Sequence, residues 1–381
     1  MEIIVALSLA IWLFLWLFWG DFWRADQRLA PTSQTLATMP RICAVIPARD
    51  EAEAIAASLT SLLKQNYPGE FSLILVDDNS NDRTAEIAQA TAESLRQTQR
   101  LTIMAGKPLA LGWKGKLWAM HQGFEQAQAQ APDYILFTDA DIQHSPDNLT
   151  QLVSKAQTEN RALVSLMVLL RCQSFWEKLL IPAFVYFFQQ LYPFPWVNDP
   201  QKSTAAAAGG CVLISNQALT SIGGIPAIKD ALIDDCTLAQ AVKSQQQKIW
   251  LGLSETTISL RGYDTLKAIW DTIARTAYTQ LNYSPLLLIG TLLGMILVYL
   301  VAPIGLIVGL VSSNWLVVVV SALTWILMAR TYLPTVRLYQ LSPVWALYLP
   351  AIAFLYTLMT LDSALKYYQG RGGAWKGRTY Q

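Results

Sequence analysis

The stretch YILFTDADIQHSP, residues 134–146, decides the interpretation of this chain. Its first residues have the apolar character and the length of a buried strand, and the run ends at Asp139 and Asp141, with one alanine between them. Two carboxylates at one point repel each other, and burying either one without a partner is costly. One interpretation is a solvated acidic loop. The other is a divalent cation held by carboxylate oxygens, with its remaining positions left for phosphate.

Further apolar runs of strand length accompany this one between about residue 41 and residue 263, and amphipathic helical patterns separate them. Such alternation predicts a parallel α/β sheet that is covered by helices on both faces. In sheets of this kind, ligands bind at the carboxyl ends of the strands. The expected strands are RICAVIPA, FSLILVDD, RLTIMAG, DYILFTDAD and RALVSLMVLL.

Carboxylates recur where these predicted strands end. The first strand leads into Pro47, Arg49 and Glu51, and the second ends in Asp77 and Asp78. Together with the acidic pair after the fourth strand, they crowd several negative charges at one edge of the sheet. That repulsion needs a cation or a hydrogen-bonding ligand to offset it, so the pattern favours the metal interpretation over an acidic loop.

A glycine-rich turn, GWKGK at 112–116, precedes the helical pattern LWAMHQGF. The amides of a helix start, together with Lys116, suit a diphosphate, and an exposed basic turn is the alternative. The turn does not match the phosphate-loop pattern G-x-x-x-x-G-K-[ST], because Leu117 follows the lysine.

The composition is that of a membrane protein. Of the 381 residues, 53% are hydrophobic and only 14% are charged, and the formal net charge of +1 leaves no basic surplus for nucleic acid. The four cysteines lie far apart and form no C-x-x-C pair. We therefore expect reduced cysteines and no zinc site.

Long apolar segments lie at both ends of the chain. Residues 3–20 are uncharged and of spanning length, and the lack of a basic start favours a retained anchor over a cleaved signal peptide. Arginines follow this segment and place the next part in the cytoplasm. Residues 285–329 fit two spans that turn near 312–314, and residues 343–361 are a third candidate. A full third span would put the basic tail outside, so either the tail breaks the positive-inside rule or one segment is re-entrant.

These patterns predict five parts. They are an N-terminal transmembrane anchor (1–22), a catalytic domain (38–264), an interfacial helix (265–284), a C-terminal region of two to three membrane segments (285–365) and a basic tail (366–381). Within the catalytic domain, the segment from Phe175 to Trp196 is rich in aromatic residues and interrupted by prolines. It suits an interfacial helix, with a buried core helix as the alternative.

The motifs VIPARDE, VDDNSNDRT, TDAD and IDDCTLA, in this order, resemble those of the family-2 glycosyltransferases with a GT-A fold. The details GWKGKLWAMHQG and AIWDTIARTAYTQLNYSP are most similar to the hopene-associated subgroup. The resemblance implies a Rossmann-like α/β domain on the cytoplasmic side of a bacterial cell membrane, with transmembrane helices at both ends. It implies inverting transfer of a sugar from a nucleotide-sugar, expected to be a UDP-sugar, to a lipid hydroxyl of hopanoid or terpenoid type, with Mg²⁺ or Mn²⁺ as cofactor.

The resemblance also implies a role for each matching position. Asp139 and Asp141 would be the metal ligands, with Asp141 the more direct one. Asp235 would be the base that takes the proton of the acceptor hydroxyl, with Asp234 beside it, and capping of a helix start is the structural alternative for both. The implied nucleotide-sugar-binding residues are Pro47, Arg49, Glu51, Asp78, Lys116, Asp139 and Gly210.

Other functions compete with this one. The family often carries a Q/R-x-x-R-W motif, of which Arg275 alone is kept here. This departure argues against the interpretation of the protein as a polysaccharide synthase. A polyprenyl-phosphate sugar transferase is the nearer alternative. Its anionic acceptor would prefer a basic interfacial pocket, to which only Arg171, Lys178, Lys202 and Arg275 are obvious contributors. An inactive scaffold conflicts with the intact acidic motifs, and an ion-coupled transporter lacks acidic residues inside its spans before Asp362.

Overall fold

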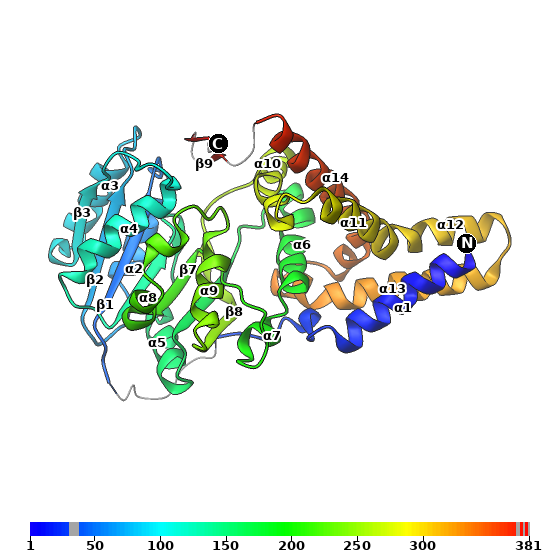
Figure 1. Ribbon diagram of the computed structural model, residues 1–381, viewed down its shortest axis with the longest axis horizontal. Coiled ribbons are helices and arrows are strands. Elements are labelled where there is room, and N and C mark those ends of the chain that lie inside the picture. The colour runs from blue at the N-terminus through cyan, green and yellow to red at the C-terminus, as the bar shows by residue number, and fades with distance from the viewer. Residues whose placement is uncertain (30–37, 371–373, 376–377, 380–381) are drawn as a thin grey trace.

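The computed structural model describes residues 1–29, 38–370, 374–375 and 378–379. It places an α/β domain beside a helical bundle that tapers away from it, with the N-terminus near the narrow end (Figure 1). The basic tail expected at 366–381 falls partly outside the described residues, as Arg371 and Lys376 do. The described part of the tail pairs β9 (Ala374–Trp375) with β10 (Arg378–Thr379).

Eight strands form the central sheet of the α/β domain: β1 (Ile42–Ala48), β2 (Phe71–Asp77), β3 (Leu101–Ala105), β4 (Tyr134–Thr138), β5 (Ile142–Gln143), β6 (Leu163–Leu169), β7 (Cys211–Ser215) and β8 (Ile249–Ser259). Their order across the sheet is β3-β2-β1-β4-β7-β6-β8-β5. The five runs predicted as strands are β1, β2, β3, β4 and β6, and this prediction is confirmed.

The first half of the sheet is parallel, as predicted: β1 pairs in parallel with β2 and β4, and β2 with β3. The prediction of a parallel sheet is wrong for two strands, because β7 runs antiparallel to both β4 and β6 and β5 runs antiparallel to β8, whereas β6 and β8 are parallel. A strand that is buried on both faces is apolar in either direction, so its direction has no local signal. The reversal sets Cys211 opposite Thr138, which brings the glycines before β7 to the end of β4.

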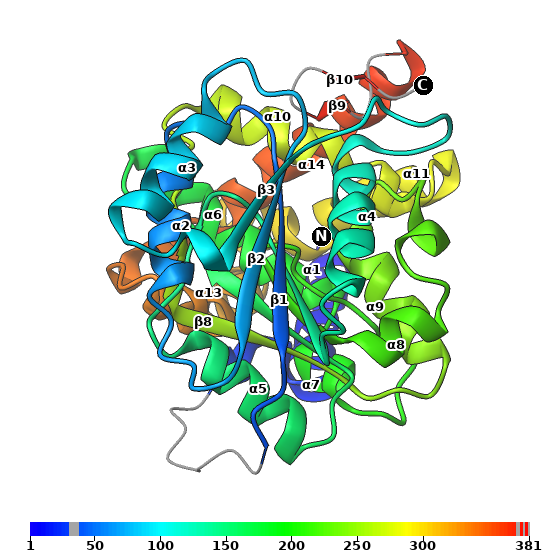
Figure 2. The ribbon, with the colours of Figure 1, turned by 90° about the vertical axis from the view of Figure 1, so that its left-hand side faces the viewer.

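Helices cover both faces of the sheet (Figure 2). Side chains of β1 alternate between the two layers, with Ile42 and Ala44 in one core and Cys43 and Val45 in the other. A Cβ at Gly123 would lie 2.4 Å from Val45 Cγ1, so glycine is what lets its helix pack this close to β1. One layer is α2 (Ile55–Leu63), α3 (Thr84–Ser94) and α5 (Asn148–Thr158), and the other is α4 (Gly115–Gln128), α8 (Asn216–Ser221) and α9 (Asp234–Ser244).

The α/β domain and the bundle share one hydrophobic core, and α6 (Phe175–Leu191) joins them. The fully buried Tyr186 of α6 has its ring centroid 5.1 Å from that of Tyr332, and its hydroxyl lies within hydrogen-bond distance, 2.9 Å, of Thr331 Oγ1. Only the ends of α6 are strongly exposed, at Phe175 and Leu191. The segment predicted as an interfacial or a core helix is therefore largely buried at the junction, and α7 (Phe194–Asn198) follows it.

Among the described residues, three helices are long and apolar enough to cross a membrane, and they span residues 285–311, 315–338 and 343–368. The first consists of α11 (Pro285–Met295), a π-helical turn and α12 (Val301–Val311), and the second is α13 (Trp315–Leu338). The predicted turn near 312–314 is confirmed. At this narrow end Asn314 Nδ2 donates to Glu2 Oε1 at 2.7 Å, so α1 (Glu2–Phe18), α12 and α13 meet there.

The third segment begins and ends on the side of the catalytic domain. After α13 the chain turns back, and the indole N–H of Trp325, halfway along α13, donates to Leu347 O at 3.0 Å. From this depth α14 (Leu349–Tyr368) returns to α10 (Leu266–Thr276), where Lys366 Nζ lies 3.1 Å from Asp271 Oδ1. This geometry favours the re-entrant alternative and keeps the end of α14 beside the catalytic domain.

Single cysteines test this topology. With Ser313→Cys at the narrow end and Gln369→Cys after α14, we expect a membrane-impermeant maleimide to label the two positions from opposite sides of a sealed vesicle. Ser94→Cys, on an exposed position of α3, marks the side of the catalytic domain. A complete third span would instead put positions 313 and 369 on the same side, and that result would contradict the re-entrant arrangement.

Candidate active site

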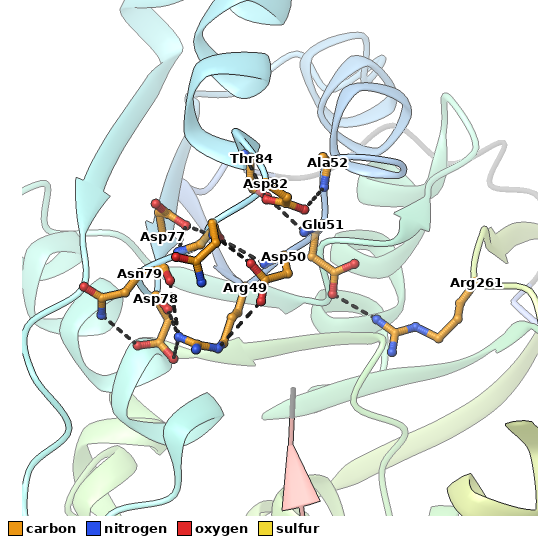
Figure 3. A network of polar contacts seen from close by, with 12 residues as sticks. Arg49, Asp50, Glu51, Ala52, Asp77, Asp78, Asn79, Asp82, Thr84 and Arg261 are labelled. Atoms are coloured by element: carbon orange, nitrogen blue, oxygen red, sulfur yellow. Dashed lines mark hydrogen bonds and ion pairs between the residues drawn. The ribbon is translucent and has the colours of Figure 1, made fainter. Parts of the chain in front are cut away.

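The loops that leave β1 and β2 are tied to each other (Figure 3). The Ala52 amide donates to Asp82 Oδ2 at 2.9 Å, and the Asn81 amide donates to Asp50 Oδ1 at 2.8 Å. Asp50 itself lies in the left-handed backbone region at φ 51°, which is costly for a residue with a side chain and persists only where the surroundings enforce it. The cross-links therefore fix the residues that follow β1.

Arg49 and Asp78, two of the predicted nucleotide-binding residues, face each other across these loops (Figure 3). Arg49 Nη1 donates to the backbone oxygen of Asp78 at 2.5 Å and lies 3.9 Å from its carboxylate Oδ2. A Cβ at Gly106, after β3, would lie 3.2 Å from Asp78 Cα, so a larger residue there would crowd the pair. An acceptor and a donor held side by side offer the two kinds of group that the edge of a nucleobase requires.

A cavity of about 300 Å³ lies at the carboxyl ends of β1 and β4. Its walls come from the sheet, from α4 and α9, and from α6 and α10 of the junction with the bundle. Most of the predicted site residues line this cavity: Pro47, Glu51, Lys116, Asp139, Asp141, Gly210, Asp234 and Asp235. Arg49 and Asp78 lie in the neighbouring loops instead.

Lys116, in the first turn of α4, joins two acidic motifs. Its Nζ lies 2.8 Å from Asp139 Oδ1 and 3.4 Å from Asp234 Oδ2. Burial disfavours its charge, but the attraction of Asp139 and Asp234 outweighs burial and raises the pKa of Lys116 well above its ordinary value. The lysine is therefore a permanent cation between the end of β4 and the start of α9.

Arg261, just after β8, forms ion pairs with two further carboxylates of the cavity, those of Asp141 and Glu51. Its Nε lies 2.8 Å from Asp141 Oδ2 and its Nη2 lies 2.9 Å from Glu51 Oε1, as Figure 3 shows for Glu51. Sequence reasoning missed this residue, which stands two residues after the end of β8, because the first charge after the apolar run IWLGL is Glu255 and not the arginine.

Asp235 is held by two backbone amides at the start of α9. Its Oδ2 accepts from the Gly209 N–H and its Oδ1 from the Cys236 N–H, both at 2.8 Å. Burial and the neighbouring charge of Asp234 raise the pKa of Asp235 from 3.8 to about 6, although Lys116 opposes the shift. The carboxylate is thus fixed in direction and more basic than an ordinary aspartate, which are properties of a general base.

The raised pKa predicts the pH dependence of activity. A base must be deprotonated to accept a proton, so the rate should fall as the pH drops through about 6, where Asp235 becomes protonated. Each further unit of pH lowers the carboxylate fraction about tenfold. The pH profile of kcat/KM checks this, and a rate that stays constant from about pH 7 down to about pH 5 would contradict a role for this carboxyl as base.

His144 supports the loop after the two aspartates. Its Nδ1 accepts from Asn148 Nδ2 at 3.0 Å, so Nε2 carries the proton and donates to Thr138 Oγ1 at 2.9 Å. Burial lowers the pKa of His144 to about 3 and keeps the ring neutral. Thr138 Oγ1 in turn donates to Gly210 O at 2.9 Å, which ties the end of β4 to the glycines before β7.

Glu177 links α6 to the wall of the cavity. It is fully buried, closes a capping box with Ser174, and accepts the Tyr263 N–H at 2.7 Å. Arg171 Nη1 lies 3.3 Å from the Glu177 carboxylate and 2.9 Å from that of Asp264. The segment after β8 is thereby fastened to the helix at the junction, and sequence reasoning did not foresee this link.

The carboxylates of Asp139 and Asp141 have the chemistry to hold a divalent cation, whose remaining ligands would be phosphate oxygens. Mg²⁺ and similar hard cations take oxygen ligands, and Mg²⁺ commonly uses one or two carboxylates together with phosphate oxygens. Within the described residues there is no group of three or more histidine, cysteine or acidic side chains placed to hold a metal by themselves. The donor set therefore suits a shared metal–diphosphate site rather than a site built only from protein.

Residues 43–222 match the family model described as glycosyl transferase family 2. This part of the chain is a family-2 glycosyltransferase domain. A mannosyltransferase from Pyrobaculum calidifontis, solved with GDP-Man and Mn²⁺, superposes with a TM-score of 0.56 at 19% identity and covers 96% of this chain and 98% of its own. The likeness shows the GT-A fold, so the predicted fold class is confirmed.

Curated relatives match a shorter part of the chain. An undecaprenyl-phosphate 4-deoxy-4-formamido-L-arabinose transferase of Pseudomonas aeruginosa is 32% identical over 121 residues, which are 30% of this chain and 32% of the relative. A 4,4'-diaponeurosporenoate glycosyltransferase of Staphylococcus haemolyticus is 32% identical over 131 residues, 34% of this chain and 32% of its own length. The chain spans about a third of the length of these relatives.

Proposed function

We propose that the protein is a membrane-bound, metal-dependent, inverting glycosyltransferase that moves a sugar from a nucleotide-sugar to a lipid hydroxyl. A UDP-sugar is the expected donor, and a hopanoid or other terpenoid is the expected acceptor. One observation carries the proposal: the cavity that holds Asp235 and the two aspartates after β4 is also lined by helices of the junction with the bundle. The family-2 domain supports the reaction type.

The wall on the bundle side suits a lipid. Phe184 and Phe188 of α6 line the cavity, and Leu170 and Met167 at the end of β6 continue the apolar surface. The helix α6 packs against two of the helices that are long and apolar enough for a membrane, through the contact of Tyr186 with Tyr332 of α13 and the hydrogen bond from the Tyr356 hydroxyl of α14 to Leu180 O. An acceptor with an apolar body can therefore place its head group at Asp235 while its body stays against the bundle.

The reaction needs a base on the acceptor side and a stabilised leaving group on the donor side. Asp235 takes the hydroxyl proton as the acceptor oxygen attacks the anomeric carbon. Lys116 faces the departing diphosphate from the start of α4, where the helix amides add a positive potential. Asp139 and Asp141 would hold Mg²⁺ or Mn²⁺, which when bound supplies positive charge to the diphosphate.

An anionic acceptor is the second candidate, and Arg275 of α10 favours it. This exposed residue lines the cavity on the bundle side and has no ion pair among the residues that the structure describes. A guanidinium at this place suits a lipid phosphate. Among the relatives, one is named for an undecaprenyl-phosphate acceptor, so a polyprenyl-phosphate sugar transferase is the alternative.

Labelled donors test the function directly. Membranes that contain the protein are incubated with radiolabelled nucleotide-sugars, native lipid extract and Mn²⁺, and label in the organic phase is measured. We expect label that EDTA abolishes and that Asp141→Asn loses. Mild acid then separates the two acceptors, because it releases sugar from a lipid phosphate and leaves a glycoside of a lipid hydroxyl intact.

Each outcome decides between the candidates. Acid-stable label supports the lipid hydroxyl, and acid-labile label supports the lipid phosphate. Water-soluble sugar released from the donor without lipid label shows an enzyme that uses another acceptor. Neither lipid label nor donor hydrolysis, with intact protein and all donors, would support the inactive scaffold and overturn the proposal.

A further inference from the structure

The segment Asp139–Ala140–Asp141 is called the D-A-D motif, and both of its aspartates are paired with cations that the protein itself supplies. Asp139 contacts Lys116, and Asp141 contacts Arg261, which also contacts Glu51. The carboxylate proposed as the more direct metal ligand is therefore also the partner of a guanidinium. Two cations cannot share one carboxylate at such short range without strong repulsion.

The contact between Arg261 and Asp141 is built into the backbone. The Leu260 N–H donates to the backbone oxygen of Asp141 at 2.8 Å, next to the ion pair of the two side chains. Further along, Tyr263 is fastened to Glu177 of α6. The segment after β8 is thus held at both ends, and the guanidinium is delivered to the D-A-D motif by a fixed path.

Little solvent screens this contact. The side chain of Asp141 is 10% exposed and that of Glu51 is 13% exposed, while Arg261 is 37% exposed and faces the cavity. A divalent cation that binds Asp141 must therefore either displace the guanidinium of Arg261 or bind against its electrostatic repulsion. Either effect lowers the affinity of the site for a metal ion by itself.

A nucleoside diphosphate removes this competition. Its oxygens are better partners for a guanidinium than one carboxylate oxygen, because the planar fork of arginine binds phosphate through two parallel hydrogen bonds. Glu51 gives Arg261 a second anchor, so the side chain can leave Asp141 without losing every partner. Transfer of the guanidinium to the diphosphate frees Asp141 for the metal.

We propose that Arg261 competes with the divalent cation for Asp141 and passes to the diphosphate of the donor, so that metal and nucleotide bind cooperatively. This inference rests on the proposed metal-dependent use of a nucleotide-sugar. By linkage, the nucleotide must raise the metal affinity by the same factor as the metal raises the nucleotide affinity. The arrangement keeps the site weak for metal alone and strong for the metal–nucleotide pair.

Binding of Mn²⁺ to the purified full chain, followed by electron paramagnetic resonance of the free ion, tests the competition. Without nucleotide, Arg261→Gln should bind Mn²⁺ about tenfold more tightly than the wild type, because one competing positive charge is gone. Arg261→Lys keeps the charge with fewer contacts and should gain only about threefold. The double variant Arg261→Gln with Asp141→Asn should lose the gain, which locates it at Asp141.

A matched control is Arg41→Gln, which removes an arginine that is paired with Glu70 before the amino end of β1. It should leave Mn²⁺ binding unchanged. Equal Mn²⁺ affinities of the wild type and both Arg261 variants, with unchanged unfolding midpoints, would overturn the proposal. If Arg261→Gln unfolds, the gain or its absence in Arg261→Lys decides instead.

Repeating the Mn²⁺ titration with nucleotide present distinguishes a failure of this inference from a failure of the proposed function. UDP and GDP are each added to the Mn²⁺ titration, and the one that binds should raise the wild-type affinity for Mn²⁺ at least about tenfold but that of Arg261→Gln much less. If neither nucleotide changes Mn²⁺ binding in any variant, the proposed function and the transfer of Arg261 to a diphosphate both fail. The comparison without nucleotide still decides whether Arg261 competes for Asp141.

Discussion

Asp235→Asn is expected to lower kcat by about 10³-fold while the affinity for the donor changes by less than about threefold. The amide cannot take a proton from the acceptor hydroxyl, whereas the donor side of the cavity keeps Lys116 and both D-A-D carboxylates. The substitution also places an NH₂ group against one of the two N–H donors, at Gly209 or Cys236, so some loss of stability will accompany it. Steady-state kinetics with the donor identified by labelling measure both quantities.

Asp234→Asn is the matched comparison, because Asp234 precedes the proposed base on the same helix start and contacts Lys116 at 3.4 Å. Its loss should lower kcat by only about tenfold, since Lys116 keeps Asp139 as a partner. Similar losses of kcat in Asp235→Asn and Asp234→Asn would show that activity depends on the start of α9 as a whole. Asp235 would then have no separate role as base.

Lys116→Met is expected to lower kcat/KM for the donor by at least about 100-fold. Methionine keeps most of the side-chain volume but removes the cation between Asp139 and Asp234, and the uncompensated carboxylates then repel the diphosphate. The same loss should lower the free energy of unfolding by about 3 kcal/mol, because the acidic groups stay partly buried without their partner. Donor kinetics and thermal unfolding in detergent measure the two effects.

Lys116→Arg retains the charge and should recover much of the stability, with less recovery of activity because the guanidinium is larger and planar. Lys155→Met on α5 removes a lysine that pairs with Glu159 away from the cavity, and it should leave donor kinetics unchanged. Full donor affinity in Lys116→Met would contradict a role of this lysine at the diphosphate.

The candidate site could be predicted from the sequence where a charge follows directly on an apolar strand. Asp78, Asp139 and Asp141 are such residues, and the parallel order of β1, β2 and β4 brings the ends of their strands to one edge. The antiparallel direction of β7 relative to its neighbours could not be predicted in this way, because a buried apolar run has the same pattern in both directions. Arg261 was missed because its strand, β8, was not recognised.

Contacts between distant segments had no sequence signal at all. Glu177 appears in the sequence as an acid at the start of an aromatic helix, which capping alone explains. Its contact with Tyr263 arises only when α6 and the end of β8 are folded together. Likewise the apolar length of 343–368 fits a full span, and the contact of Trp325 with Leu347 is what reveals the turn back.

The turn of the chain before α14 makes the bundle unequal at its two ends. Beside the catalytic domain it contains α6, α10, α11 and the end of α14, whereas α1, α12 and α13 alone meet at the far end among the described residues (Figure 1). In a bilayer such a body takes up more area in the leaflet next to the catalytic domain than in the opposite leaflet. With its three apolar helices in a bilayer, it would act as a wedge that favours membrane curvature convex toward the catalytic domain, and lipid shape would then be a factor in its stability.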